Sequence, residues 1–229
     1  MRPGPLGRRF RRHGKLMPVQ SKICGITTPE SLDAAVAGGA THIGLNFFAK
    51  SPRYIDAERA AALVARAAGQ SKIVGLFVDA EPNFIDSIRK TVRLDIIQLH
   101  GEERPALVSR IAMSNGLETW KAIPVKTASD LKEAHKYRGA AQRILYDAKP
   151  PKGLELTGGT GQRFDWTLLE GYAHSLPWAL AGGLDPSNVR EAIRVTGAVM
   201  VDVSSGVESA PGIKDVDKIA AFLKAASLS

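Results

Sequence analysis

Short, continuous apolar runs recur along this chain, and each is followed by a stretch of helical character. Their apolar residues are consecutive rather than alternating, which is typical of strands buried on both faces of a parallel sheet. The runs recur at intervals of roughly 20 to 35 residues along the chain. The predicted strands are residues 19–23, 41–47, 72–78, 94–99, 117–123, 142–147, 177–181 and 198–203.

The stretches between these strands carry helix signals. Prolines open several of them, Asp56 is a natural N-cap, and glycines follow their ends. The predicted helices are residues 29–37, 56–68, 82–90, 102–113, 128–137, a short helix from 165, 186–194 and 214–226, with a long loop over 148–163. Eight strand–helix units in one chain predict a single (β/α)8 barrel, the TIM barrel. The alternative is an open doubly wound sheet, but the glycine fingerprint expected after its first strand is missing.

Charge divides the chain into two parts. The net charge is +8, and residues 1–16 hold six arginines and lysines and no acid, so residues 17–229 carry only +2. The first segment is rich in glycine and proline and has little to bury, so we predict a disordered basic extension over 1–16 and a barrel domain over 17–229.

Three interpretations of the basic extension remain open. It is a translated leader upstream of a true start at Met17, which we favour, or a transit-like segment that lacks the usual serines, or a nucleic-acid-binding arm.

Composition excludes several classes of protein. Hydrophobic residues make up 44% and charged residues 24%, as in globular proteins. A single cysteine excludes an intrachain disulfide and fits a reducing compartment. No apolar run approaches the roughly 20 residues of a membrane helix. No spacing of Cys and His indicates a metal site, and no nucleotide motif is present. We therefore expect a cytoplasmic protein with no metal and no membrane partner.

In a TIM barrel the chemistry lies at the carboxyl ends of the strands. In this chain those ends are polar, small or reactive almost throughout, which apolar strands would not give by chance. They comprise Cys24, residues 46–53, Asp79, His100, Gly101, Lys121, Asp147, Gly182, Gly183 and residues 202–206.

Two consecutive strand ends indicate a phosphate site. Gly182 and Gly183 follow the seventh strand, and Ser204, Ser205 and Gly206 follow the eighth. Glycines let backbone N–H groups approach an anion, and hydroxyls add donors. Either motif alone would be read as a glycine turn or a serine N-cap, but together they favour phosphate binding.

Cys24 and Asp147 end the first and sixth strands, so we expect them to face each other across the barrel mouth. A thiolate and a carboxylic acid form a base and acid pair, for which the pKa of the thiol should be lowered. The alternatives are an inert buried cysteine and a structural aspartate. Arg53 is either a carboxylate clamp or a solvated loop charge. His100 is expected to be a supporting residue.

The sequence resembles the phosphoribosylanthranilate isomerase family of tryptophan biosynthesis. The resemblance runs from residue 21 to about 213, and Asp79 departs from it, because asparagine is more usual there. The matching stretches are Lys22-Ile23-Cys24-Gly25-Ile26-Thr27, Ser51-Pro52-Arg53-Tyr54, Gln98-Leu99-His100-Gly101, Gly158-Gly159-Thr160-Gly161 with Phe164-Asp165-Trp166, Leu180-Ala181-Gly182-Gly183-Leu184, and Val201-Asp202-Val203-Ser204-Ser205-Gly206-Val207-Glu208.

The resemblance implies an Amadori rearrangement of a small phosphorylated substrate, N-(5-phosphoribosyl)anthranilate, without a cofactor. It implies that Asp147 is the acid, Cys24 the base and Arg53 the partner of the anthranilate carboxylate. It also implies a set of substrate-binding and supporting positions: Gly159, Gly182, Gly183, Asp202, Ser204, Ser205, Gly206 and Glu208. It leaves monomer and homodimer open.

Two alternative functions fit parts of the sequence. The histidine-pathway Amadori isomerase needs a second phosphate cradle, but the loops after the third and fourth strands are acidic, with Asp79, Glu81, Glu102 and Glu103. That family also places a carboxylate where Cys24 lies. The other rival is a non-catalytic nucleic-acid-binding protein that acts through its basic extension; we predict no nucleic-acid partner.

Overall fold

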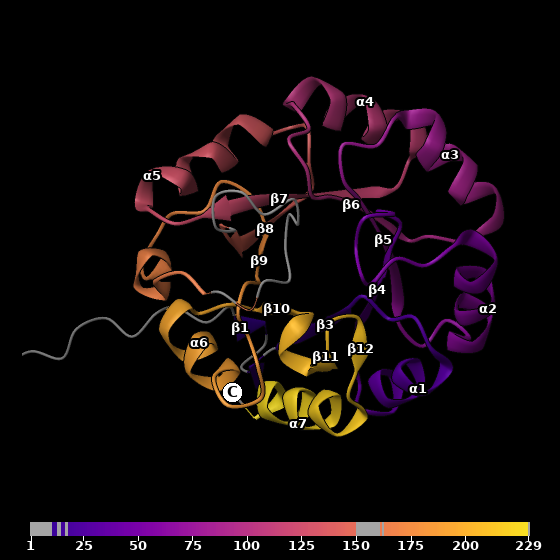
Figure 1. Ribbon diagram of the computed structural model, residues 1–229. Coiled ribbons are helices and arrows are strands. Elements are labelled where there is room, and N and C mark those ends of the chain that lie inside the picture. Colours follow the sequence, from indigo (N-terminus) through magenta and orange to yellow (C-terminus); the bar gives the residue numbers. More distant parts are fainter. Residues whose placement is uncertain (1–10, 13–14, 17, 150–160, 162, 229) are drawn as a thin grey trace, which may run out of the picture.

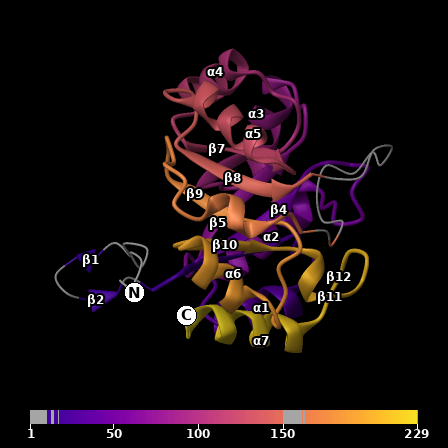
Figure 2. The same ribbon diagram turned by 90° about the vertical axis from the view of Figure 1, so that its left-hand side faces the viewer.

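The computed structural model of the protein describes residues 11–12, 15–16, 18–149, 161 and 163–228. Gly159, most of the predicted loop over 148–163 and most of the basic extension lie outside the described residues. Within the extension, β1 (Arg11–Arg12) and β2 (Lys15–Leu16) pair with each other in an antiparallel ladder that is separate from the barrel (Figure 2). The expected disorder of residues 1–16 stays a prediction.

Eight parallel strands close into a barrel, as predicted (Figure 1). Neighbours in sequence pair throughout, and the first and last strands also pair, with Val203 opposite Ile23. This closure excludes the open sheet. The strands are β3 (Gln20–Cys24), β4 (His42–Asn46), β5 (Lys72–Phe77), β6 (Ile96–Leu99), β7 (Glu118–Val125), β8 (Arg143–Ala148), β9 (Trp178–Leu180) and β10 (Met200–Val203).

A ring of helices surrounds the barrel (Figure 1). Thr28 and Asp56 cap the first two through side-chain oxygens that accept backbone N–H groups, and Pro29 and Pro82 occupy first turns, as their positions predict. The helices are α1 (Pro29–Ala37), α2 (Ala57–Ala67), α3 (Pro82–Thr91), α4 (Pro105–Asn115), α5 (Ala128–Leu131), α6 (Val189–Thr196) and α7 (Val216–Ser227), with the 3₁₀ helices η1 (Lys132–Tyr137), η2 (Trp166–Leu169) and η3 (Ser205–Val207).

Side chains fill the barrel in alternation along the strands. One apolar cluster contains only strand residues and neighbours, among them Val74, Ile96, Trp120, Leu145 and Met200. A larger cluster joins the opposite strand faces to the helices. Polar side chains are buried at the carboxyl ends of the strands: Lys22, Gln98, Asp147 and Asp202. These buried polar side chains give the carboxyl end of the barrel groups from which a site can form.

The helix expected over 186–194 begins at Val189, and three further elements differ from the predictions. The helix expected at 102 begins at Pro105, because Glu103 instead accepts the amides of Asp79 and Gly101 and pairs with Lys121 at 3.1 Å. Asp79, the departure from the family pattern, has φ +47°, a conformation that aspartate tolerates nearly as well as asparagine.

The other two differences lie later in the chain. The helix expected over 128–137 tightens into η1 after Leu131, whose carbonyl accepts the Tyr172 hydroxyl at 3.2 Å. A hairpin that the sequence did not predict, β11 (Glu208–Ala210) with β12 (Ile213–Lys214), follows the eighth barrel strand. It delays α7 from 214 to Val216.

Candidate active site

The predicted acid and base lie at the same end of the barrel. Cys24 ends β3 and Asp147 lies near the end of β8, three strands away around the barrel through β10 and β9. Asp202 lies on the intervening β10 and interacts electrostatically with both Cys24 and Asp147. The fold therefore gathers Cys24, Asp202 and Asp147 at one mouth, as their strand-end positions predict.

Asp147 is held on both carboxylate oxygens. Its Oδ1 accepts the Ala148 backbone N–H at 2.8 Å, and its Oδ2 lies 3.0 Å from His100 Nε2. A Cβ atom on Gly182 would lie 2.9 Å from the same Oδ1, so that glycine packs directly against the carboxylate. The Asp147 carboxyl group is therefore buried and held in a fixed orientation.

His100 belongs to a short hydrogen-bonded chain that ends on Asp147. The Gln98 amide Nε2 lies 2.9 Å from His100 Nδ1, and both side chains are on β6 or directly after it. With the Gln98 amide in this orientation, Nδ1 accepts and Nε2–H donates to Asp147. Gln98 Oε1 is buried and has no hydrogen-bond partner among the described residues. His100 thus contacts Asp147 directly, and its supporting role stays a prediction.

The pKa of Cys24 differs from the prediction. The residue is 6% exposed, and burial raises the pKa of its thiol, because a thiolate loses solvation there. The nearby ammonium groups of Lys22 and Lys214 act in the opposite direction but do not outweigh burial. The expectation of a lowered pKa is therefore wrong for the protein in this state.

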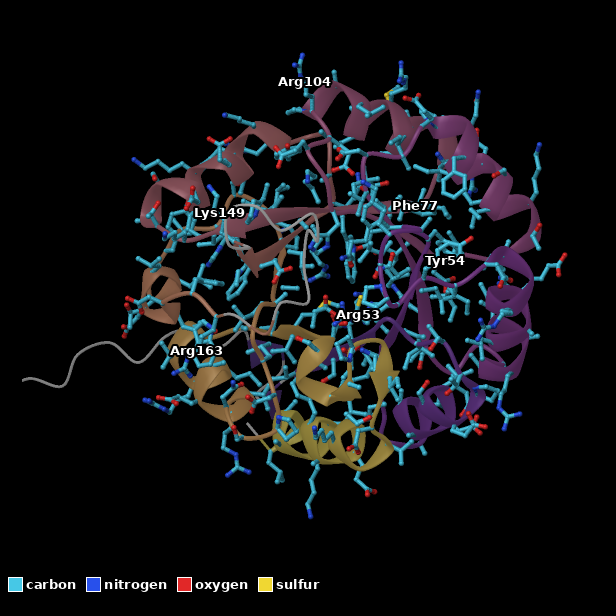
Figure 3. The ribbon with its side chains drawn as sticks, viewed as in Figure 1. Arg53, Tyr54, Phe77, Arg104, Lys149 and Arg163 are labelled. Carbon is cyan, nitrogen blue, oxygen red and sulfur yellow. The ribbon has the colours of Figure 1, made fainter. Side chains whose placement is uncertain are left out.

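Arg53 is a buried ion-pair partner and not a solvated loop charge. Its Nε and Nη2 donate to the two oxygens of Glu208 at 2.7 and 2.8 Å. Lys214 Nζ contacts the same carboxylate at 2.8 Å and also donates to the Ser204 carbonyl at 2.9 Å. Figure 3 labels Arg53 inside the ring of helices. Arg53 and Lys214 thus both bind the Glu208 carboxylate.

The Arg53 side chain packs closely against Gly25. Gly25 has φ +79°, and a Cβ atom there would lie 2.7 Å from Arg53 Cδ. Glycine is therefore needed for both the backbone conformation and the space that the arginine occupies. Gly25, after β3, and Arg53, after β4, therefore pack directly against each other.

The two predicted phosphate loops pack against each other. Gly182 and Gly183 have φ +84° and +65°, conformations that glycine adopts without strain. Gly206 lies so close to the Leu184 carbonyl that a Cβ atom would overlap it. Ser204 donates its hydroxyl to the Cys24 carbonyl at 3.1 Å, which connects this loop to the predicted base. Ser205 begins η3.

We expect Gly206→Ala to raise KM strongly and to lower the melting temperature. The added methyl must displace Leu184 or Asp185, which separates the two loops, whereas the positions of Cys24 and Asp147 depend on the strands. Steady-state kinetics with a thermal melt checks this. Gly139→Ala is the control for loss of a glycine without crowding, because no described atom lies near its Cβ position; its φ of +80° adds a backbone strain that Gly206→Ala does not carry. An unchanged KM in Gly206→Ala would contradict the role of the loop.

Sequence reasoning assigned no role to Lys22, Gln98 or Lys214. Lys22 carries a signal, because it is a lysine inside a buried strand, two positions before the reactive cysteine. Gln98 carries the same kind of signal, as an amide inside an apolar strand. Lys214 carried none, because its position depends on the hairpin that the apolar pattern does not predict.

Taken together, the structure is a closed (β/α)8 barrel whose mouth gathers Cys24, Asp202 and Asp147 beside the two packed glycine and serine loops. Residues 21–225 match the sequence profile of the family described as N-(5'phosphoribosyl)anthranilate (PRA) isomerase. The chain therefore belongs to this family, whose members are isomerases of tryptophan biosynthesis.

Individual relatives agree with this assignment. The N-(5'-phosphoribosyl)anthranilate isomerase of Paramagnetospirillum magneticum is 53% identical over 92% of this chain and 98% of its own length. The crystal structure of the phosphoribosyl anthranilate isomerase of Thermotoga maritima is 40% identical, with a TM-score of 0.83, over 92% of this chain and all of that one. A further isomerase structure, in complex with reduced 1-(o-carboxyphenylamino)-1-deoxyribulose 5-phosphate, is 38% identical with a TM-score of 0.80, over the same shares of the two chains.

Among the residues that the structure describes, no cluster of three or more His, Cys, Asp and Glu side chains is arranged to hold a metal ion. No helix in the described ranges combines the length and the apolar character needed to cross a membrane.

Proposed function

We propose that this chain isomerises N-(5-phosphoribosyl)anthranilate to 1-(2-carboxyphenylamino)-1-deoxyribulose 5-phosphate, with Asp147 as general acid and Cys24 as general base. The observation that carries the assignment is the placement of these two groups at one barrel mouth, with Asp202 between them. The reaction is an internal redox change in one carbon skeleton, so acid–base groups suffice and no cofactor enters it.

The proton transfers follow from this placement. Asp147 donates its proton to the furanose ring oxygen, the bond from C1 to that oxygen breaks, and the nitrogen lone pair forms an iminium with C1. The Cys24 thiolate then takes the C2 proton, and the C2–H electron pair forms the enolamine and neutralises the nitrogen. The enolamine finally becomes the ketone as the C2 hydroxyl loses its proton and C1 gains one.

The substrate carries two anionic groups, and the mouth offers two sites for them. We assign the phosphate to the packed loops with Gly182, Gly183, Ser204, Ser205 and Gly206. We assign the anthranilate carboxylate to Arg53, as the resemblance implies, with Glu208 orienting the guanidinium. Asp202 lies between the acid and the base and faces the sugar. Gly159, which the resemblance also implies, lies outside the described residues.

The test is the fluorescence decay of enzymatically generated phosphoribosylanthranilate in the presence of the purified chain. The expected result is a decay at a rate proportional to enzyme concentration, with the rearranged ribulose phosphate as product. A folded protein that leaves the fluorescence unchanged would contradict the proposed reaction.

We expect a chain that starts at Met17 to keep full isomerase activity. The mouth is built from residues after β3 begins, and β1 and β2 do not join the barrel. Comparison of kcat and KM between the full chain and the shortened chain checks this. Loss of activity on deletion of residues 1–16 would contradict the leader interpretation and reopen the nucleic-acid-binding alternative, which salt-dependent binding to random duplex DNA would then test.

Assembly and location complete the proposal. The partner is a small phosphorylated molecule, and the chain acts as a monomer or homodimer; one relative from Thermotoga maritima is described as dimeric phosphoribosylanthranilate isomerase, from which monomers were generated. The base must be a free thiol, which a reducing compartment preserves, so we place the enzyme in the cytoplasm.

A further inference from the structure

Lys22 is a buried ammonium group that the proposed proton transfers do not use. Its side chain is fully buried, and its Nζ lies 3.0 Å from Asp202 Oδ1. It sits two positions before Cys24 on β3, so both side chains leave the same face of the strand. A buried charge destabilises the fold unless it is paired. Two acidic groups are available to pair with the Lys22 ammonium, the carboxylate of Asp202 and the thiol of Cys24.

The space over Gly44, on the adjacent strand β4, shows how close the ammonium and the sulfur lie. A Cβ atom on this glycine would lie 3.0 Å from Cys24 Sγ and 3.0 Å from Lys22 Nζ. The two side chains therefore share the space that a larger residue would fill. Lys22 also interacts with Cys24 by charge, whereas its hydrogen bond goes to Asp202 at 3.0 Å.

We propose that Lys22 is a positioning residue that holds its ammonium against the Cys24 sulfur and stabilises the thiolate, with Asp202 as the competing anion. The stabilisation that the Lys22 ammonium gives to the Cys24 thiolate then depends on how strongly Lys22 is bound by Asp202. When Cys24 loses its proton to solvent, the net charge of these three groups falls from zero to −1, and the ammonium is shared between two anions.

This arrangement resolves the conflict between the burial of Cys24 and its use as a base. Burial favours the neutral thiol, and a cation in contact with the sulfur is the means by which a protein offsets that cost. Of the two cations that act on the thiol, Lys22 has the larger effect and Lys214, from β12, the smaller.

Three further titratable side chains lie around Lys22, Cys24 and Asp202. His42, on β4, faces Lys22, and burial together with that ammonium lowers the pKa of His42 to about 3, so the imidazole adds no charge near neutral pH. Asp147, on β8, and His100, after β6, act on Asp202. None of them replaces Lys22 as the cation beside the sulfur.

The test is a titration of the thiol itself, which needs no substrate. Cys24 is the only cysteine of the chain, so the ultraviolet absorbance of the thiolate reports one group when Cys24→Ser is subtracted. The catalytic meaning of the inference rests on the proposed role of Cys24 as base, but the titration does not. If the titration behaves as expected and Cys24→Ser remains fully active, the proposed role of Cys24 as base fails and the inference about its thiolate stands.

Two variants should move the titration in opposite directions. Lys22→Met is expected to raise its midpoint by about 1 to 3 pH units, because the sulfur loses its nearest cation. Asp202→Asn is expected to lower the midpoint, because Lys22 is left with the sulfur as its anionic partner. The acidic limb of the kcat/KM profile of any active variant should move with the thiol.

Lys121→Met is the matched control. Lys121 is also a buried barrel lysine in an ion pair, with Glu103 at 3.1 Å, but it lies on β7 and makes no contact with Cys24 in the described part of the chain. Its loss should leave the thiol midpoint in place. Circular dichroism establishes folding for each variant, and Asp202→Asn keeps the test decisive if Lys22→Met fails to fold. An unchanged midpoint in Lys22→Met, or a raised midpoint in Asp202→Asn, would overturn the proposal.

Discussion

Replacement of Cys24 by serine is expected to lower kcat by about 10² to 10⁴ while KM changes little. Serine has nearly the same shape, so the packing against Gly44 and the hydrogen bond from Ser204 to the Cys24 carbonyl are kept. A hydroxyl, however, holds its proton far more tightly than a thiol and cannot become the base for the C2 proton. The measurement is the decay of substrate fluorescence under saturating and limiting substrate.

Chemical modification provides a second readout for the same residue. The wild-type chain has one thiol, so a small alkylating agent should abolish its activity, with protection by the product. The residual activity of Cys24→Ser should not respond to the agent. Full activity in Cys24→Ser would mean that the cysteine is an inert core residue, and the base would have to be sought among the other groups of the mouth, with Asp202 first.

The strand and helix pattern predicted the barrel because parallel strands buried on both faces are continuous apolar runs, which recur along this chain with a helix after each. Strand ends shifted by only a few residues, as for β6, which begins at Ile96 and not at 94. The hairpin of β11 and β12 was missed because its residues carry no apolar alternation. Glu208 instead anchors it through Arg53 and Lys214, contacts between distant parts of the chain that no local pattern contains.

The candidate site was predictable as far as it depends on strand ends. Cys24 and Asp147 follow from topology, because the carboxyl ends of all strands meet at one mouth. The pKa of Cys24 was not predictable in the same way, since it depends on burial and on Lys22, Lys214 and Asp202, which come from three strands. Sequence gives the positions of chemical groups; their charges depend on contacts that only the folded chain defines.

Replacement of Asp147 by asparagine is expected to lower kcat by about 10² to 10⁴, again with a smaller change in KM. Asparagine has the same shape, and its amide oxygen can still accept the Ala148 N–H. It cannot deliver a proton to the furanose oxygen, so ring opening slows. Stopped assays that separate kcat from KM check this, with Asp33→Asn as control, because that carboxylate belongs to an exposed ion pair with Arg66 and should not affect kcat.

His100 determines how the result of this variant is to be interpreted. Its Nε2 lies 3.0 Å from the Asp147 carboxylate, so it is the nearest other group that could carry a proton to the ring oxygen. If Asp147→Asn loses activity and the double variant with His100→Asn loses no more, the aspartate is the acid and the histidine acts through it. If Asp147→Asn stays close to wild type and His100→Asn alone abolishes turnover, the acid is the imidazole, and Asp147 serves to hold it.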